Sequence, residues 1–338
     1  MNIKGKKYLL FWLRLSLVIL VLMVVLGGIT RLTQSGLSIP YWKPITGILP
    51  PTDIISWQNE FNEYKKYPEY IKQNYNMSIE EYKIIYYWEY FHRMIGRMIG
   101  LLFFFPFIYF YYKNYLDKNL VKKLLFLLFL GMLQGFMGWY MVKSGLVENP
   151  QISHYRLSAH LFLAFIIIAY IYKVEISLKY FKQNKINKFQ FFNKFINIII
   201  VVFFIQIIYG AFTAGLKAGK LWNTFPLIEG KLIPDNLFSI EPLYLNLFEH
   251  KKMVQFIHRC NGILLMLLIY VFSFKVQNSK LVLNNKSRAL IALVSCQVFL
   301  GVITLISKSS IVLSSFHQVL AIFLLLQLIN IKHFLKYE

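Results

Sequence analysis

The sequence predicts an all-α integral membrane protein whose eight transmembrane helices form two parallel-repeat four-helix bundles. Three observations support this prediction: long apolar segments, an alternation of basic and acidic loops, and an internal repeat. The chain has 338 residues, of which 57% are hydrophobic, and its mean hydropathy is +0.51. A soluble domain of this length does not carry so many long apolar segments, so we expect the chain to lie in a lipid bilayer.

Eight apolar segments are each long enough to cross the hydrocarbon core, which takes roughly 20 helical residues. They are continuous rather than alternating, and this favours helices over barrel strands as the way to satisfy the backbone inside lipid. The first segment is too long for a signal peptide and is not followed by a small-residue cleavage site. We expect the spans at 10–30, 88–112, 121–142, 154–174, 194–215, 252–275, 287–307 and 312–332.

The net charge of +22 can indicate a nucleic-acid partner, but its distribution indicates membrane topology instead, and no nucleic acid is expected. Lys and Arg dominate the start of the chain and the loops at 113–123, 173–194 and 275–288, whereas most Asp and Glu residues lie in the other loops. The positive-inside rule then places both termini in the cytoplasm and two long loops, 31–87 and 216–251, outside. Residues 1–9 do not resemble a mitochondrial transit segment, so we expect the inner membrane of a bacterial cell.

The second half of the chain repeats the first. Gly27, Thr30, Gly36, Gly47 and Pro51 recur 183 residues later as Gly210, Thr213, Gly219, Gly230 and Pro234. Three further motifs recur in the same order, as His92/His258, Gln134/Gln297 and His160/His317. Because each half holds an even number of spans, the halves have the same orientation, and we expect one four-helix bundle in 1–175 and another in 190–338. Gly96-x-x-x-Gly100 and Gly131-x-x-x-Gly135 predict close helix approach.

Four histidines lie on spans two, four, six and eight, at similar depth near the outer face: His92, His160, His258 and His317. Ionisable groups inside a span are costly and usually functional, and an interhelical hydrogen bond would account for one of them but not for four in repeat-related positions. Two facing imidazoles inside a four-helix bundle suit the axial ligation of heme iron. Zinc would need three or four ligands per site. We therefore expect one heme between His92 and His160 and another between His258 and His317.

The other histidines and the two cysteines have simpler interpretations. His154, His250 and His333 are expected to be interfacial or solvated. Cys260 and Cys296 fall within spans, so we expect small buried hydrophobic residues rather than a disulfide.

The two halves differ at one position beside the histidines. Glu89 precedes His92 by three residues and shares its helical face, whereas the equivalent residue of the second half is Gln255, which cannot ionise. This asymmetry suggests one reactive site and one electron-transfer site. Arg93 and Arg259 follow the histidines and either pair with heme propionates or reach the outer headgroups. The outer loops are expected to fold back over the bundle as lids, and 53–87 to form a short amphipathic helical insert.

Seven segments spread in order over nearly the whole chain form a distinctive series. They are GGITRLTQSGLSIPYWKPITGILPP at 27–51, WEYFHRMIGR at 88–97, LQGFMGWYMVKSGL at 133–146, RLSAH at 156–160, LWNTFPLIEGKLIP at 221–234, VQFIHR at 254–259 and FHQ at 316–318. Together they resemble the heme A synthase family, in the branch shared by proteobacteria and mitochondria.

The resemblance implies that heme O, which already carries its farnesyl tail, has its C8 methyl group oxidised by successive hydroxylations to the formyl group of heme A, for cytochrome oxidase. Glu89 and His92 match the family's Glu-x-x-His motif, with His160 as the partner histidine, and these three are the implied catalytic residues at the substrate heme. His258 and His317 match the pair that binds the iron of a heme b cofactor. The resemblance makes heme O synthase (protoheme farnesyltransferase) a candidate partner and leaves the electron acceptor open.

Two other functions would use the same four histidines. A bis-histidine membrane cytochrome would pass electrons between a quinone and an outer partner, and a heme transporter or chaperone would carry the porphyrin unchanged. The unpaired carboxylate of Glu89 favours the enzyme, because a symmetric electron-transfer chain has no need of it. The chemical distinction is that an enzyme changes the porphyrin, whereas a cytochrome or a transporter returns it unaltered.

Overall fold

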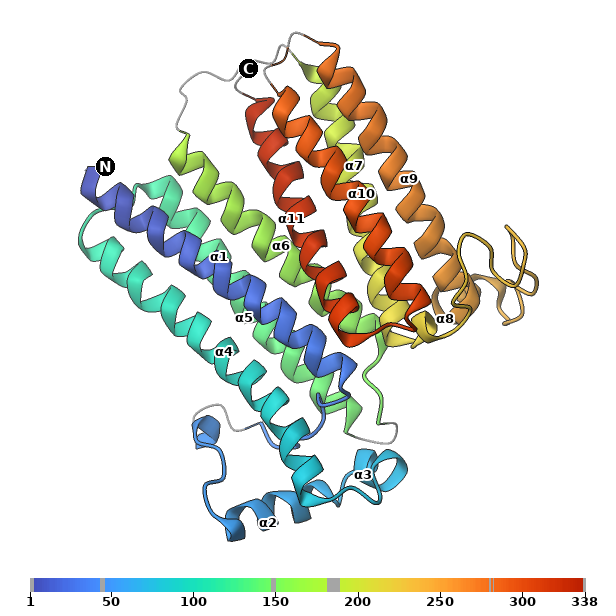
Figure 1. Ribbon diagram of the computed structural model, residues 1–338. Coiled ribbons are helices and arrows are strands. Elements are labelled where there is room, and N and C mark those ends of the chain that lie inside the picture. The colour runs from blue at the N-terminus through green and yellow to red at the C-terminus, as the bar shows by residue number, and fades with distance from the viewer. Residues whose placement is uncertain are drawn as a thin grey trace.

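The computed structural model describes residues 3–42, 46–146, 150–180, 189–279, 281 and 283–336. These residues form helices and loops, with one isolated β-bridge between Ile228 and Lys231 (Figure 1). The all-helical fold is therefore confirmed. Parts of two predicted basic loops, at 181–188, 280 and 282, lie outside the described residues.

Eight of the helices are long and apolar enough to cross a membrane, which confirms the predicted number of spans in the part of the chain that the structure describes. Most run a few residues past the predicted limits. The second begins at Ile79 rather than at 88, because a capping box between Ser78 and Glu81 starts the helix well before its apolar part. The eight are α1 (Ile3–Leu32), α4 (Ile79–Tyr112), α5 (Lys118–Gly145), α6 (His154–Lys179), α7 (Gln190–Gly215), α9 (Lys251–Gln277), α10 (Asn284–Ile306) and α11 (Ile311–Phe334).

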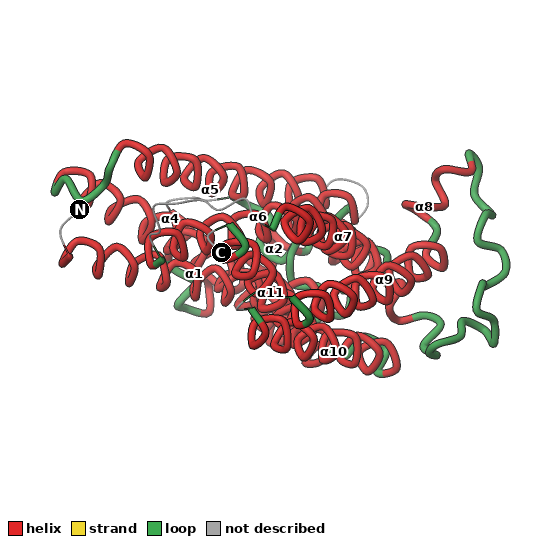
Figure 2. The backbone as a smooth tube through the Cα atoms, turned by 90° about the horizontal axis from the view of Figure 1, so that it is seen from above, coloured by secondary structure: helices red, strands yellow, loops and turns green. Residues whose placement is uncertain are grey.

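Helix packing follows the same pattern in the first four and the last four of these helices (Figures 1 and 2). α1 packs against α4 and α6, and α5 packs against α6; correspondingly, α7 packs against α9 and α11, and α10 packs against α11. α6, α7, α1 and α11 join the two groups. Two pairs differ in extent between the halves: α9 packs closely along α10 whereas α4 touches α5 only sparsely, and α1 packs closely along α6 whereas α7 touches α11 only sparsely.

The buried apolar side chains gather in the end of the bundle that carries the two labelled termini in Figure 1. One cluster lies among α1, α4, α5 and α6, and includes Leu13, Phe107 and Leu124. A second is centred on α7, α9, α10 and α11, and includes Phe203 and Phe272. Toward the other end the packing opens, because no residue is buried in 90–102 of α4, 131–144 of α5, 256–264 of α9 or 295–306 of α10. Each of the four histidines lies at this less tightly packed level.

The loop-side ends of α1 and α7 meet where the two groups of helices join. Arg31 donates from Nη2 to the carbonyl oxygens of Ala214 at 2.7 Å and Gly215 at 3.2 Å, which satisfies acceptors left open at the end of α7. Lys217 donates to Gln34 beside this contact. Gly215 also lies directly against the start of α6, because a Cβ there would come within 2.4 Å of His154 Cβ.

Three of the detailed expectations were wrong. Gly100, Gly131 and Gly135 do not mediate close helix contacts, since a Cβ on any of them would meet nothing within 4 Å. Cys260 and Cys296 are exposed on the outside of the helices rather than buried. His154 and His333 are buried rather than solvated, His154 at the start of α6 and His333 near the end of α11.

The first long loop folds into two short helices, α2 (Ile54–Tyr64) and α3 (Pro68–Gln73), which lie beside the start of α4 (Figure 1). Its aromatic residues pack on one another: Phe61 and Tyr64 each stack on Tyr82 with ring centroids 5.0 Å apart. The remaining short elements are η1 (Thr46–Ile48), η2 (Ala218–Lys220), η3 (Leu243–Leu245) and α8 (Asn246–Glu249).

Glu69 is buried inside this insert, where Tyr64 donates a hydrogen bond to it at 3.0 Å. Burial raises the pKa of Glu69 to about 8, because desolvation of the carboxylate outweighs the hydrogen bond from Tyr64. The insert is therefore most stable while Glu69 is protonated.

Replacing Gly215 by Ala is expected to lower stability by about 1–3 kcal/mol, because the added methyl meets the backbone of α6 and one helix must shift. The measurement is the midpoint of thermal unfolding in detergent. Gly100→Ala is the matched control, since its methyl enters open space and the helix propensity of Ala exceeds that of Gly. Equal unfolding midpoints for G215A and wild type would show that α6 and α7 are less closely packed in the protein than in this structure.

The stability of the insert is expected to fall as pH rises from about 4.5 to about 8. In this window the folded insert keeps the proton of Glu69 and the unfolded chain has lost it. Unfolding therefore releases a proton, and the stability falls by at most about 1.4 kcal/mol per pH unit. Hydrogen exchange of residues 54–74, corrected for intrinsic rates, measures this. Glu69→Gln retains an acceptor for Tyr64, and the exchange rates of the insert in this variant should not depend on pH. Wild-type exchange rates that do not change with pH would contradict the prediction.

Candidate functional site

The four predicted histidines lie on four different helices, His92 on α4, His160 on α6, His258 on α9 and His317 on α11. His92 and His160 are near enough to interact electrostatically, and so are His258 and His317. The structure thus brings together the two pairs that the sequence predicts.

Each of the four rings lies against a glycine of a neighbouring helix. A Cβ built on Gly27 of α1 would lie 3.0 Å from His92 Nε2, and one on Gly210 of α7 would lie 3.1 Å from His258 Cε1. The same relation holds for Gly138 with His160, at 3.3 Å, and for Gly301 with His317, at 3.0 Å. The glycines that recur in the sequence therefore make room for the imidazoles.

A glutamine amide contacts three of the four histidines. Gln134 donates from Nε2 to the backbone carbonyl of His160 at 3.1 Å, and its Nε2 lies 3.3 Å from a ring nitrogen of the same residue. Gln297 contacts His317 in the same way, at 3.0 Å to the carbonyl and 3.3 Å to the ring. Gln206 contacts His258 at 3.0 Å and 3.5 Å.

The unsatisfied polar atoms at this level fit an axially ligated heme. The Nδ1 atoms of His160 and His258 are buried without a hydrogen-bond partner, and so are the Oε1 atoms of Gln134 and Gln297. A histidine that binds a metal through one ring nitrogen usually donates the other N–H to an acceptor, and the free amide oxygens offer one beside each pair. Two imidazoles per site, held in a loosely packed part of the bundle, are a donor set that suits heme iron.

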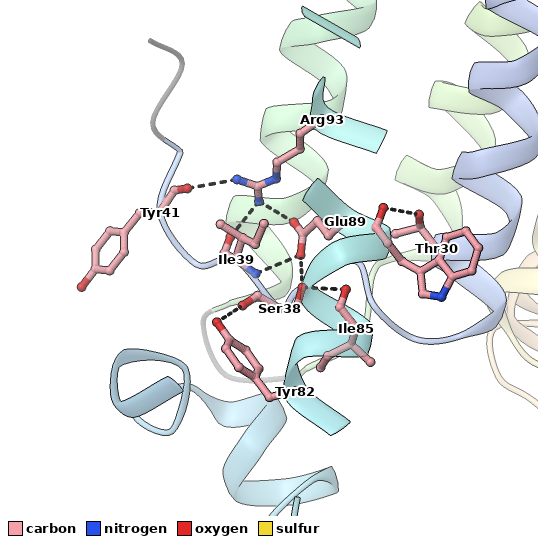
Figure 3. A network of polar contacts seen from close by, with 9 residues as sticks. Thr30, Ser38, Ile39, Tyr41, Tyr82, Ile85, Glu89 and Arg93 are labelled. Carbon is pink, nitrogen blue, oxygen red and sulfur yellow. Dashed lines mark hydrogen bonds and ion pairs between the residues drawn. The ribbon is translucent and has the colours of Figure 1, made fainter. Parts of the chain in front are cut away.

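Glu89 is buried beside His92, and both of its oxygens are engaged by neighbours (Figure 3). Oε1 accepts from Arg93 Nη2, while Oε2 accepts from Ser38 Oγ at 2.8 Å and from the backbone N–H of Ile39 at 2.9 Å. Arg93 also donates to the carbonyl oxygens of Ile39 at 2.7 Å and Tyr41 at 3.0 Å. Together these contacts, which we call the first clasp, fasten the loop segment 38–41 to α4.

The second half has a clasp at the repeat-related positions. Arg259 donates to Gln255 Oε1 at 2.9 Å, as Arg93 does to Glu89. The residues that accept from Arg259, Trp222 and Thr224, both at 2.7 Å, lie 183 positions after Ile39 and Tyr41. The difference is in polarity: Gln255 Nε2 donates to the loop carbonyls of Ala218 and Leu221, whereas Glu89 accepts from loop donors.

The clasps change the interpretation of the two arginines. The sequence suggests heme propionates or outer headgroups as partners of Arg93 and Arg259, and the structure adds loop carbonyls to which both arginines donate. It also shows how each long loop is fastened at the histidine end of its helices.

Several residues of the site were not predicted from the sequence. Gln134 and Gln297 are recognisable in the sequence as repeat-related residues, but no role was assigned to them. The signal that could have indicated their contact with a histidine is the glycine four positions later, one turn along the same helical face. Gln206 has the same spacing to Gly210. Ser38 and Ile39 lie in a loop and gave no periodic signal, so only the fold reveals their contact with Glu89.

The chain is similar to curated heme A synthases and to a protein family. Residues 10–329 match the family model described as cytochrome oxidase assembly protein, COX15-CtaA. The heme A synthase of Wolbachia pipientis wMel is 44% identical over 93% of this chain and 88% of its own length. Those of Flavobacterium johnsoniae and Nitrosospira multiformis are 44% and 41% identical, over 95% and 98% of this chain and 96% and 94% of their own lengths.

Glu89→Gln is expected to loosen the first clasp, because an amide cannot accept from Ser38 and Ile39 while also facing Arg93 with an oxygen. Loss of one or two charge-assisted hydrogen bonds costs about 1.5–3 kcal/mol each, so hydrogen exchange at 35–42 should accelerate tenfold or more. Ser38→Ala removes one neutral donor and should have a smaller effect. Unchanged exchange in E89Q would show that Glu89 does not hold the loop.

Proposed function

The chain belongs to the heme A synthase family of cytochrome oxidase assembly proteins, and from this we propose that it oxidises the C8 methyl group of heme O to a formyl group. The chain is thus an oxidoreductase of that family. We propose two parallel four-helix bundles with different tasks: His92 and His160 of the first would bind the iron of heme O, and His258 and His317 of the second would bind heme b. The observation that carries the proposal is the repeated contact of a histidine pair with glycines, combined with a carboxylate in one half only.

The assignment of the larger substrate to the first bundle is supported by the space around it. A Cβ on Gly100 of α4 or on Gly131 of α5 would meet nothing within 4 Å, and these two helices touch sparsely. At the repeat-related positions the second bundle carries Met266 and the buried Val294, and α9 and α10 pack together. A heme with a farnesyl tail needs more apolar room than heme b, so the first bundle is the better site for heme O.

The protein's own residues would act by binding, orienting and closing. His92 and His160 would fix the porphyrin from its two faces, and the first clasp would hold segment 38–41 beside it and keep water out. The buried carboxylate of Glu89 would stabilise positive charge that develops on the methyl carbon during oxidation, since its partners hold it in place before the reaction. Heme b, when bound, supplies one-electron redox chemistry.

We also propose that the loop-side ends of the helices face the periplasm of a bacterial inner membrane and that both termini are cytoplasmic. The basic composition of the loops at the terminus end supports this. Heme O would then be oxidised near the outer face. Heme O synthase is a suitable donor partner, because a farnesylated porphyrin dissolves poorly in water.

The test is to produce the chain together with a heme O synthase, extract the non-covalent hemes and determine their masses. The wild type should yield heme b together with heme A or its hydroxylated intermediate. His258→Ala and His317→Ala should lose the heme b absorption, whereas His92→Ala, His160→Ala and Glu89→Ala should keep it and reduce heme A formation at least a hundredfold, because each removes a group at the substrate.

His250→Ala is the control, because this residue lies in the second outer loop. Heme b with unaltered heme O in folded wild-type protein, with an electron donor and an acceptor present, would favour the electron-transfer cytochrome. Normal turnover in Glu89→Ala would remove the carboxylate from the proposed chemistry.

A further inference from the structure

Among the four histidines, His92 alone has no amide side chain against it in the described chain. The glutamine that contacts His258, Gln206, lies four residues before Gly210 on α7. The equivalent residue of α1, four before Gly27, is Met23. The two side chains occupy the same place: Gln206 Nε2 lies 3.0 Å from a Cβ built on Gly262, and Met23 Cε lies 3.1 Å from one built on Gly96.

A second residue completes the difference. Asn261 donates from Nδ2 to Gln206 Oε1 at 2.8 Å and to the carbonyl of Val202 at 3.2 Å. This fixes the direction of the Gln206 amide, so that its nitrogen points toward His258. The equivalent residue of the first half is Ile95, which can neither donate nor accept. His258 is therefore tied to α7 through a polar network of two side chains, and His92 has an apolar pair in its place.

The consequence for a bound heme follows from how ligand histidines are held. Polar side chains that hold a ligating histidine in place typically change its affinity roughly 10–100-fold when they are lost. Gln206 donates to the backbone carbonyl of His258 at 3.0 Å, and its amide nitrogen lies 3.5 Å from the ring. A thioether has no donor and is only a weak acceptor, so Met23 cannot replace the amide. Within the first pair, His160 keeps its amide from Gln134. The looser histidine of the molecule is thus His92.

We propose that Gln206 and Asn261 are positioning residues that hold His258 in place, so that the second site retains its heme. Met23 and Ile95 do not hold His92 in this way, so His92 can release its heme. The first site would then exchange substrate for product through His92 while His160 stays in place, and the second site would keep its heme through many turnovers. The inference rests on the proposed function, because it assigns exchange to the first pair and retention to the second.

The experiment exchanges the two residues and measures heme loss directly. In protein made without heme O synthase, the transfer of the resident heme to apomyoglobin is followed by absorption. Gln206→Met is expected to speed this transfer tenfold or more and to shift the low-spin EPR signal, because His258 is no longer held against α7 through its carbonyl and its ring loses its polar neighbour. In protein loaded with ferric heme O, Met23→Gln should slow the transfer of heme O tenfold or more. Met23→Leu keeps the apolar pair and should behave as wild type.

The outcomes separate this inference from the function on which it rests. If His258→Ala keeps the resident heme, the proposed function fails. If His258→Ala loses the heme but folded Gln206→Met releases it at the wild-type rate, the inference alone is wrong. If Met23→Gln does not fold, the double variant Met23→Gln/Ile95→Asn supplies the amide with its partner, and the Gln206→Met arm decides by itself if that also fails to fold.

Discussion

The contact of each histidine ring with a glycine on the neighbouring helix fixes the geometry of the site. A methyl group at Gly27 or Gly210 would lie within about 3 Å of the ring, so the imidazole could not stay where it is. Because these helices must approach closely, the glutamine one turn before Gly138, Gly210 or Gly301 reaches the carbonyl of the facing histidine. For the same reason the loops that follow α1 and α7 come within reach of α4 and α9. The amides and the clasps therefore depend on four positions that have no side chain.

This arrangement divides the bundle along its length. Apolar side chains fill the terminus end, where they stabilise the helices against one another. At the histidine level the same helices present few buried residues, so this level contributes little packing energy. The polar clasps close the outer end and offset part of that loss.

Much of the molecule was predictable from the sequence, because hydropathy and duplication are strong signals. The eight helices, the four histidines and the Glu89/Gln255 difference could all be seen in this way. The start of α4 at Ile79 could not be placed by hydropathy, since a capping box sets it. The glycine pairs were misjudged because a G-x-x-x-G spacing does not say whether another helix is present; Gly131 and Gly135 face open space. The role of Gln206 could not be predicted, because an amide in a membrane span indicates that a polar group needs a hydrogen-bond partner but does not identify the partner.

The two clasps also differ in charge, and this affects the reduction potential of a heme bound beside each of them. In the first, the carboxylate of Glu89 neutralises Arg93. In the second, Arg259 faces the neutral Gln255, and no acidic side chain pairs with it in the described part of the chain. An uncompensated positive charge favours the reduced form of a nearby heme, because reduction removes one positive charge from the iron. With heme b in the second bundle, its electron affinity would exceed that of the same group beside Glu89. The Glu89/Gln255 difference would thus give the two histidine pairs different electrostatic surroundings, and a heme held by each would differ in reduction potential.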